Sequence, residues 1–386
     1  MRKLIQIVVA IALIAGFSFM GGQSVNKATA SGGESKIKEI IGKYTFLMED
    51  GTLWSQVDGY RIIRTPGSLA SIAGNDDYGG LALSEDGQLM EWGVDGSGSR
   101  PVAGQTGVKQ VVDGYWLKTD GTVWQSGSKK LKGLEGISMI GYGGGNGDSL
   151  ASKSLAVLTQ TGELILVGHY SGGKNVKVGT IADVNSVKSM TVSYGRAALL
   201  YDSGQVIVYD AVNFDDNGTI IPVTVAQDAA HIVYTAGDPD TPDILLVTRK
   251  DGTLWQTGKY QGRWKLDHQV TGLGTVAKTA TYSDYKQFYV MRSDGSWIFY
   301  DDEEIKPVDV PTVKQVDVSL SELKPLVGES LKINIQETYT NGAKIKVAPT
   351  AANVSIDKPH LLAIQPDGRL KVLGVAKRKQ PLRRAA

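Results

Sequence analysis

The chain has 386 residues, no cysteine and a formal net charge of +1. An exported protein without cysteine cannot rely on disulfides, so its stability has to come from a large core. Residues 1–30 carry three basic and no acidic side chains and residues 377–386 carry five basic ones, which leaves −7 on residues 31–376. A mildly acidic body argues against electrostatic binding of nucleic acid.

Residues 1–30 have the pattern of a secretory signal peptide. Arg2 and Lys3 precede an apolar run over residues 4–20, and Ala28-Thr-Ala30 offers small side chains for cleavage before Ser31. The run of about 17 residues is short for a membrane span, and a retained N-terminal anchor is the alternative. We therefore expect a secreted or cell-surface protein that has no membrane segment after cleavage.

A short motif then recurs seven times between about residues 34 and 310: an apolar run, Asp-Gly or a near copy, and a second apolar run. The turn glycines are Gly51, Gly87, Gly121, Gly162, Gly204, Gly252 and Gly295. Each copy predicts a β-hairpin in which Asp-Gly supplies the positive φ angles of a tight turn. A short strand of the form apolar-x-x-apolar stands upstream, as at residues 37–40 and 108–111. Repeats of this length predict an all-β fold, a closed β-propeller of seven blades.

Five copies carry a tryptophan after the turn, and we expect these rings to be buried between neighbouring blades. They are Trp54, Trp92, Trp124, Trp255 and Trp297. The fourth and fifth copies have Ile165 and Ile207 or Val208 instead. Packing tolerates that replacement, whereas a binding cage would not.

The repeat resembles the RCC1 (regulator of chromosome condensation) repeat, with its best instances at residues 81–93, 117–127 and 246–258. The resemblance extends over about residues 36–300 and implies a seven-bladed RCC1-like propeller. The family's histidine ahead of the apolar strand and its Asn-x-x-Gly-Gln tail are missing, so nucleotide exchange and chromatin binding are not expected. Secreted bacterial members, including a proteinaceous β-lactamase inhibitor, bind proteins through one face, and they are the closer analogy.

Residues 312–376 show a different β pattern. A Val327-Gly-Glu329 turn before a strand and a late strand ending near Val375 resemble a bacterial Ig-like domain of group 2 that lacks its final strand. Thr312–Val316 repeats the upstream strand of the third copy, so it either closes the first blade or opens this domain. The predicted organisation is a signal peptide (1–30), the propeller (31–311), a partial, incomplete Ig-like β-sandwich (312–376) and a basic disordered tail (377–386). The tail indicates either a chain end altered by truncation or frameshift, or a segment that binds acidic wall polymer or nucleic acid.

Residues suited to catalysis or metal binding are sparse. The four histidines have no metal-binding spacing, and the chain lacks both a Gly-x-Ser-x-Gly elbow and a thiol nucleophile. The glycine-rich stretch 141–147 fits a long loop better than a phosphate loop, and the acidic loops 214–218 and 237–243 fit solvated turns better than calcium sites. We therefore expect no catalysis, no cofactor and no metal, although carboxylates on distant loops could still converge into an enzyme site.

Aromatic and acidic residues recur in the loop just before the hairpins, at one end of the predicted ring. The candidate binding residues are Tyr78, Asp113, Tyr115, Trp116, Tyr142, Tyr194, Asp284 and Tyr285. Exposed tyrosines on one face suit protein recognition, since they give a large contact area at low entropy cost. The alternative is that these tyrosines only cap the core.

These observations together predict a monomeric, secreted or cell-surface binding module without catalytic activity, whose ligand is an extracellular protein. A lectin-like propeller that binds cell-wall glycan and an extracellular polysaccharide-acting enzyme are the alternatives.

Overall fold

The computed structural model describes the chain in segments that divide into two compact units. The described residues are 7–9, 27–28, 36–42, 45–49, 51, 53–55, 61–63, 69–75, 79–93, 99–144, 153–167, 175–193, 195–211, 220–235, 244–260, 263–281, 287–301, 303–308, 313–321, 326–340, 342, 344–347, 349, 354–356 and 359–374. Lys36–Asp309 form one unit, here called the ring unit; Met1–Ser35 and Val310–Ala386 form the other, the small unit.

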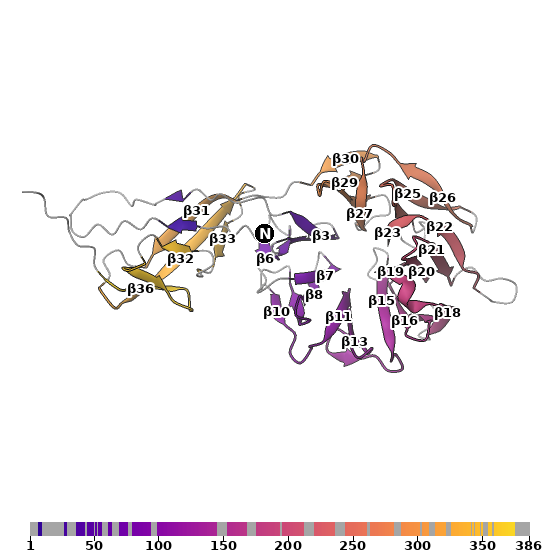
Figure 1. Cartoon of the computed structure of the whole chain (residues 1–386), viewed down its shortest axis with the longest axis horizontal. Helices are drawn as coiled ribbons and strands as arrows, with labels where there is room; N and C mark the ends of the chain where they lie inside the picture. The colour runs from indigo at the N-terminus through magenta and orange to yellow at the C-terminus, as the bar shows by residue number, and fades with distance from the viewer. Residues whose placement is uncertain are drawn as a thin grey trace, which may run out of the picture. The chain divides into compact units, whose positions relative to one another are not determined.

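The described part of the ring unit consists of seven four-stranded antiparallel sheets, each a meander of consecutive strands (Figure 1). The first three sheets are β3 (Ile37–Ile41), β4 (Thr45–Met48), β5 (Leu53–Ser55), β6 (Arg61–Ile63); β7 (Leu69–Asn75), β8 (Gly79–Ser84), β9 (Leu89–Trp92), β10 (Ser99–Pro101); and β11 (Val108–Val112), β12 (Tyr115–Lys118), β13 (Val123–Gln125), β14 (Lys129–Lys130). The next two are β15 (Ile137–Gly144), β16 (Lys153–Thr159), β17 (Glu163–Val167), β18 (Val176–Thr180); and β19 (Val187–Ser193), β20 (Arg196–Tyr201), β21 (Val206–Asp210), β22 (Val223–Ala226). The last two are β23 (Ala229–Tyr234), β24 (Leu245–Arg249), β25 (Leu254–Tyr260), β26 (Arg263–Val270); and β27 (Val276–Thr281), β28 (Gln287–Arg292), β29 (Trp297–Asp301), β30 (Glu304–Pro307).

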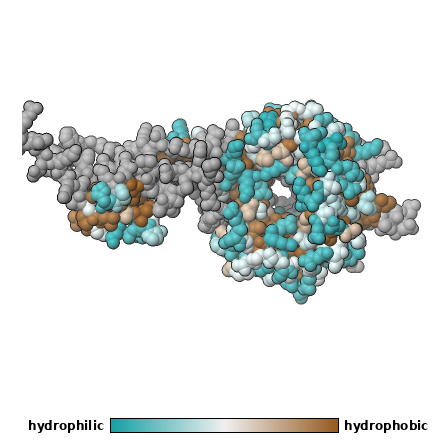
Figure 2. All heavy atoms as spheres, viewed as in Figure 1, coloured by the Kyte–Doolittle hydropathy of each residue, from teal (hydrophilic) through white to brown (hydrophobic). Residues whose placement is uncertain are grey.

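Successive sheets contact one another through their first strands, which we call the inner strands. The last sheet returns to the first: the Lys278 ammonium donates to the Lys38 carbonyl (2.7 Å), and the Trp297 indole N–H donates to the Ile37 carbonyl (3.1 Å). Figure 2 shows an opening through the middle of this unit. A closed ring of four-stranded antiparallel sheets is consistent with a β-propeller.

The predicted hairpin turns are present at all seven positions, with one correction to their geometry. The turn glycines have φ between 78° and 95°, and each donates its N–H to the carbonyl three residues earlier. Asp86, Asp120, Asp251 and Asp294, which precede four of these glycines, do not have positive φ, so only the glycine is left-handed. These turns are therefore type I turns closed by a glycine bulge.

Each apolar cluster of the core draws its buried residues from two neighbouring sheets. The cluster between the first and second sheets contains Leu47 and Trp92, and the cluster between the second and third contains Leu83 and Trp116. The same arrangement continues through the fourth to seventh sheets. Since both sides of each sheet are covered in this way, burial between sheets holds the ring together.

The tryptophan prediction is right for three positions and wrong for two. Trp54, Trp92 and Trp297 are buried, whereas Trp124 and Trp255 are only half-buried. The last two rings lie under cations instead, with Lys118 Nζ 4.8 Å from the Trp124 centroid and Arg249 Cζ 4.4 Å from the Trp255 centroid.

A hydrogen-bond chain explains the sequence Asp-Gly-Thr-x-Trp in the third and sixth sheets. The Trp124 indole N–H donates to Thr122 Oγ1 (2.9 Å), and that hydroxyl donates to Asp120 Oδ1 (2.6 Å). Trp255, Thr253 and Asp251 repeat this chain with distances of 2.9 and 2.7 Å. The hydroxyl bridges the turn carboxylate to the ring, so the half-buried tryptophans are fixed by polar contacts as well as by packing.

The small unit has its own sheet and its own core. In the described residues, β2 (Lys27–Ala28), β31 (Val313–Leu320), β32 (Ser330–Tyr339), β36 (Arg369–Val372) and β35 (Leu362–Ile364) lie in that order, with β33 (Lys344–Val347) also paired to β32. β1 (Ile7–Val9) pairs in parallel with β34 (Val354–Ile356). Val316, Ile333 and Leu370 lie at the centre of the core. Because β31 pairs with β32, the Thr312–Val316 repeat opens this unit and does not close the first blade.

No helix in the described segments is both long enough and apolar enough to cross a membrane.

Candidate functional site

The two ends of the ring unit are built from different connections. Each sheet is an antiparallel meander, so the first–second and third–fourth connections lie at one end, which we call the loop face. The second–third turns lie at the other end, the turn face. The second–third turns have three or four residues in every sheet, whereas the first–second connections range from two to ten. Binding residues concentrate on variable loops held by a rigid scaffold, so we expect a binding surface on the loop face.

Three of the predicted binding residues come together on the loop face, between the third and fourth sheets. Tyr115 begins β12 and Tyr142 lies near the end of the neighbouring inner strand β15, with ring centroids 5.5 Å apart. Burial, and secondly the negative charge of Asp113, raises the pKa of both phenols. Asp113 therefore lies close enough to act on both rings, and the three residues form one cluster, the Tyr115–Tyr142 cluster.

Both tyrosines of this cluster are half-buried and pack against the core between the third and fourth sheets. They therefore cap the core, which was the alternative to a binding role, and also leave part of each ring exposed. A tyrosine phenol is protonated at neutral pH, and burial raises these two pKa values further, so each hydroxyl is a hydrogen-bond donor as well as an acceptor.

The prediction that Trp116 is exposed is wrong. Its side chain is 1% exposed, and its indole N–H donates to Gln105 Oε1 (3.2 Å) in the core between the second and third sheets. The error has a simple cause. Consecutive residues of a strand face opposite sides, and both sides of this sheet are covered by neighbours. Tyr78, Tyr194, Asp284 and Tyr285 lie outside the described residues, as do the acidic loops 214–218 and 237–243.

A buried ion pair stiffens the loop face at the fifth sheet. Arg196 Nε lies 3.0 Å from Asp210 Oδ2, and the two side chains are 7% and 4% exposed. Next to it, the Gly195 N–H donates to Ser154 Oγ of the fourth sheet (3.2 Å). The two sheets also approach closely there, because a Cβ placed on Gly143 would overlap the Val192 carbonyl. This part of the loop face is a rigid frame beside the Tyr115–Tyr142 cluster.

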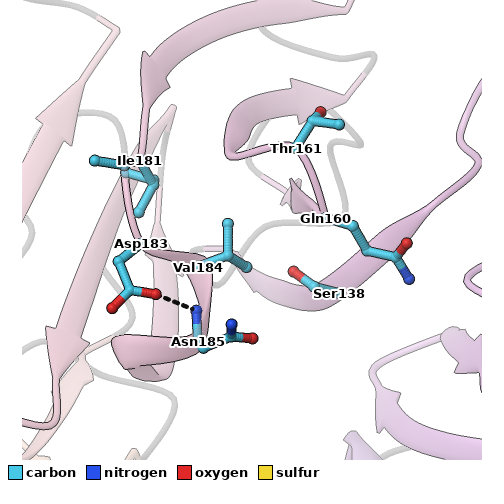
Figure 3. A pocket seen from close by; sticks show the side chains of 8 residues that line it. Ser138, Gln160, Thr161, Ile181, Asp183, Val184 and Asn185 are labelled. Atoms are coloured by element: carbon cyan, nitrogen blue, oxygen red, sulfur yellow. Dashed lines mark hydrogen bonds between the residues drawn. The ribbon is translucent and has the colours of Figure 1, made fainter.

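A second candidate site, which the sequence reasoning missed, is a polar pocket on the turn face between the fourth and fifth sheets (Figure 3). It has a volume of about 230 Å³. Its lining side chains include Ser138, Gln160, Thr161, Asp183 and Asn185. Asp183 Oδ1 accepts the Asn185 N–H (3.1 Å) and so fixes the short 3₁₀ segment Val184–Ser186 at the rim.

The hydrogen-bond link between the fourth and fifth sheets, beside the pocket, differs from the link at four other turn glycines. In four places the carbonyl of a turn glycine accepts the N–H of the first inner-strand residue of the next sheet, as Gly121 accepts from Ile137 and Gly252 from Val276. In the fourth sheet Gly162 accepts from Ile181 instead, six residues before β19 begins. The signal in the sequence was the fourth turn, which reads Gln160-Thr161-Gly162 where most copies have Asp-Gly.

The inner strands bring polar side chains to the axis, where an enzyme would place carboxylates or a histidine. Glu39 Oε2 accepts the Ile72 N–H (3.4 Å), and His231 Nδ1 accepts the Thr279 N–H (3.4 Å). Gln110 bonds both the N–H and the carbonyl of Ile140. In each case the side chain links its strand to the next inner strand, which is a structural role. Among the described residues, no group of three or more His, Asp or Glu side chains is placed to hold a metal ion.

No protein-family model matches the chain, and no curated protein matches it. Among solved structures, it is similar to Prp20p from Saccharomyces cerevisiae, described with its binding to Gsp1p and histones, at 11% identity and a TM-score of 0.43 over 64% of this chain and 80% of that chain. It is also similar to the WD40 β-propeller domain of Doa1 (16% identity, TM-score 0.46, 71% and 95% of the chains) and to the computationally designed Ika8 protein (13%, 0.45, 82% and 96%). At these values the similarities carry no argument about function.

Proposed function

We propose that this chain is a secreted or cell-surface binding protein, a seven-bladed RCC1-like β-propeller followed by an Ig-like unit, and that it binds an extracellular protein through its loop face. It acts without catalysis. The observation that carries the proposal is the Tyr115–Tyr142 cluster: two tyrosines in ring contact, with Asp113 beside them, at the end of the ring where connections vary in length. Rigid aromatic side chains beside a charged group are typical of the residues that dominate protein interfaces.

The test is capture of a partner from culture medium by the full chain, followed by affinity measurements with variants. Replacing both Tyr115 and Tyr142 by Ala should weaken binding by about 2 kcal/mol or more, as loss of hot-spot aromatics generally does. Tyr201→Ala is the matched control, because Tyr201 is also half-buried but lies at a hairpin turn on the opposite face. Thermal melts of all variants separate lost contact from lost fold. An unchanged affinity in the double variant would contradict the proposal.

A lectin-like function is the second candidate, and the polar pocket favours it. Gln160, Asn185 and Asp183 offer amide and carboxylate groups that hydrogen-bond sugar hydroxyls. A glycan array with the full chain tests this alternative. Retention that is lost in the Gln160→Ala and Asn185→Ala variants, but kept in the tyrosine variants, would move the function to the turn face.

Export with cleavage after Ala30 is part of the proposal. The signal pattern in residues 1–30 supports it. Mass spectrometry of the protein from culture medium should give an N-terminus at Ser31, and a chain retained on the cells with residues 1–30 intact would favour the anchor instead. Cleavage would also remove β1 and β2 from the small unit.

A further inference from the structure

The seven inner strands share a β-bulge at their second residue. In each of them the pairing with the second strand shifts between the first and third residues, as between Ile37 and Glu39 or between Val276 and Lys278. The same bulge at the same place puts equivalent residues at the same level around the ring. The second residues are Lys38, Ala70, Lys109, Ser138, Lys188, Ala230 and Ala277, and the third are Glu39, Ser71, Gln110, Met139, Ser189, His231 and Lys278.

These two levels hold four ammonium groups and a single carboxylate, that of Glu39. The lysines, which we call the axial lysines, are Lys38, Lys109, Lys188 and Lys278. Three of them reach along the ring to the next inner strand: Lys38 Nζ donates to the Leu69 carbonyl (2.9 Å), Lys188 Nζ to the Ala230 carbonyl (3.1 Å) and Lys278 Nζ to the Lys38 carbonyl (2.7 Å). All three acceptors are first or second residues of their strands, so these ammonium groups lie at the turn-face end of the axial opening.

Glu39 offsets part of the positive charge of Lys278 and Lys38, but none of the axial lysines forms an ion pair among the described residues. In the described part of the chain, no carboxylate lies within ion-pair distance of any of them. An ammonium has three donors, and each carbonyl contact uses one. Lys278 Nζ also lies 5.4 Å from the Trp297 ring centroid, so the exposed Lys109 and Lys188 offer the most donors to a further ligand.

The positive charge of the axial lysines shifts the pKa values of neighbouring titratable groups. Burial and, secondly, the charges of Lys278 and Lys188 together lower the pKa of His231 to about 4. Burial also lowers the pKa of Lys278, with Glu39 opposing and Lys38 adding to the effect. The surrounding chain, residues 31–376, is acidic overall. A local positive site on such a body attracts an anionic ligand and orients it.

We propose that the turn-face end of the axial opening binds an acidic protein segment through the axial lysines. They belong to the first, third, fifth and seventh sheets, so they surround the opening and do not converge on one point. Such an arrangement fits a chain that carries several carboxylates better than it fits one small oxyanion. The site lies at the opposite end of the ring from the Tyr115–Tyr142 cluster, so the two proposals can be tested independently of each other.

The test uses the full chain and a fluorescent oligoglutamate peptide, with oligoglutamine as the neutral control, by anisotropy at low ionic strength. Oligoglutamate should bind saturably and oligoglutamine should not. Lys109→Gln should weaken binding by about fivefold. Lys109 is exposed and makes no hydrogen bond through its ammonium in the described structure, so its replacement leaves the fold intact. Lys129→Gln is the matched control, an exposed lysine on the outermost strand of the same sheet, and should change nothing.

Glu39→Gln gives a result of opposite sign. The glutamine keeps an oxygen that can accept the Ile72 N–H but removes the only carboxylate at these levels, so the peptide should bind more tightly. A variant that merely disturbed the ring would not gain affinity. The proposal is overturned if oligoglutamate does not bind, if Lys129→Gln weakens binding as much as Lys109→Gln does, or if Glu39→Gln weakens it. Displacement of the peptide by inorganic phosphate at matched ionic strength would reassign the site to a small oxyanion.

Discussion

The two faces of the ring unit are made from the same strands but follow different rules. On the turn face, turns of three or four residues recur in every sheet, with a left-handed glycine and repeated hydrogen bonds to the next sheet. On the loop face, the first–second connections range from two to ten residues, and among the described residues a buried ion pair, Arg196–Asp210, occurs in the fifth sheet alone. Repetition on one face and variation on the other separate the residues that specify the fold from those that can specify a ligand.

The largest expected effect comes from the seam that closes the ring. Trp297 is buried and its indole N–H donates to the Ile37 carbonyl of the first sheet, so Trp297→Ala should cost about 3–5 kcal/mol of unfolding free energy. Trp255→Ala, at a half-exposed ring within one sheet, should cost clearly less. Urea denaturation of both variants checks the difference. Equal losses of unfolding free energy would mean that Trp297 at the seam stabilises the fold no more than Trp255 does.

The loop face should depend on its buried ion pair. Asp210→Ala leaves the Arg196 guanidinium without its buried carboxylate, which should cost about 3 kcal/mol. Replacing both residues by apolar ones of similar volume should recover most of that loss, as measured by denaturant midpoints. If the double replacement were as unstable as Asp210→Ala alone, the charge pair would not be the cause.

Between the faces, His231 should make stability depend on pH. Its pKa is lowered from 6.5 to about 4 in the folded chain, chiefly by burial, with Lys278 and Lys188 adding to the shift. The unfolded chain therefore takes up the proton first as pH falls. Stability should be unaffected by this group above about pH 6.5 and should fall between there and about pH 4, by on the order of 1–3 kcal/mol.

His231→Gln isolates that contribution in pH-dependent denaturation. The pKa of Glu39 is raised, chiefly by burial, so its effect has the opposite sign, with stability lost as pH rises through the folded value. Because the variant retains Glu39, the difference between the two pH profiles belongs to His231. Superimposable profiles would show that the histidine is not held neutral.

The smallest effect should come from the hydrogen-bond chain of the turn face. Thr122→Val removes the hydroxyl between Trp124 and Asp120 and should cost about 1 kcal/mol. Thr180→Val, on an exposed outer strand, is the control and should be nearly neutral. A double-mutant cycle with Trp124→Phe should show coupling between Thr122 and the ring. If the two changes in unfolding free energy were strictly additive, the hydrogen-bond chain would contribute no coupling energy.

The sequence predicts the repeated elements well and the ligand-facing ones poorly, for physical reasons. Hairpin turns follow from local chemistry, so each turn glycine could be placed by inspection. Burial of Trp116 depends on a neighbouring sheet from a different repeat, which a local pattern does not reveal.

The axial residues were missed for a related reason. The apolar ends of the upstream strands identify these strands in the sequence. The position of the two residues between those ends, near the axis, follows only from the closed ring. Closure brings Lys278 against Lys38, 240 residues apart in sequence. The polar pocket is similarly lined by residues next to a shifted link between two sheets, Gly162 to Ile181.

Hydrogen–deuterium exchange of the full chain, with and without the partner captured from culture medium, shows whether the loop face is the protein-binding surface. We expect slower exchange at residues 113–116 and 139–144, around the Tyr115–Tyr142 cluster, and unchanged exchange at the hairpin turns 119–122 and 250–253. Protection confined to those hairpin turns, with none around Tyr115 and Tyr142, would contradict it.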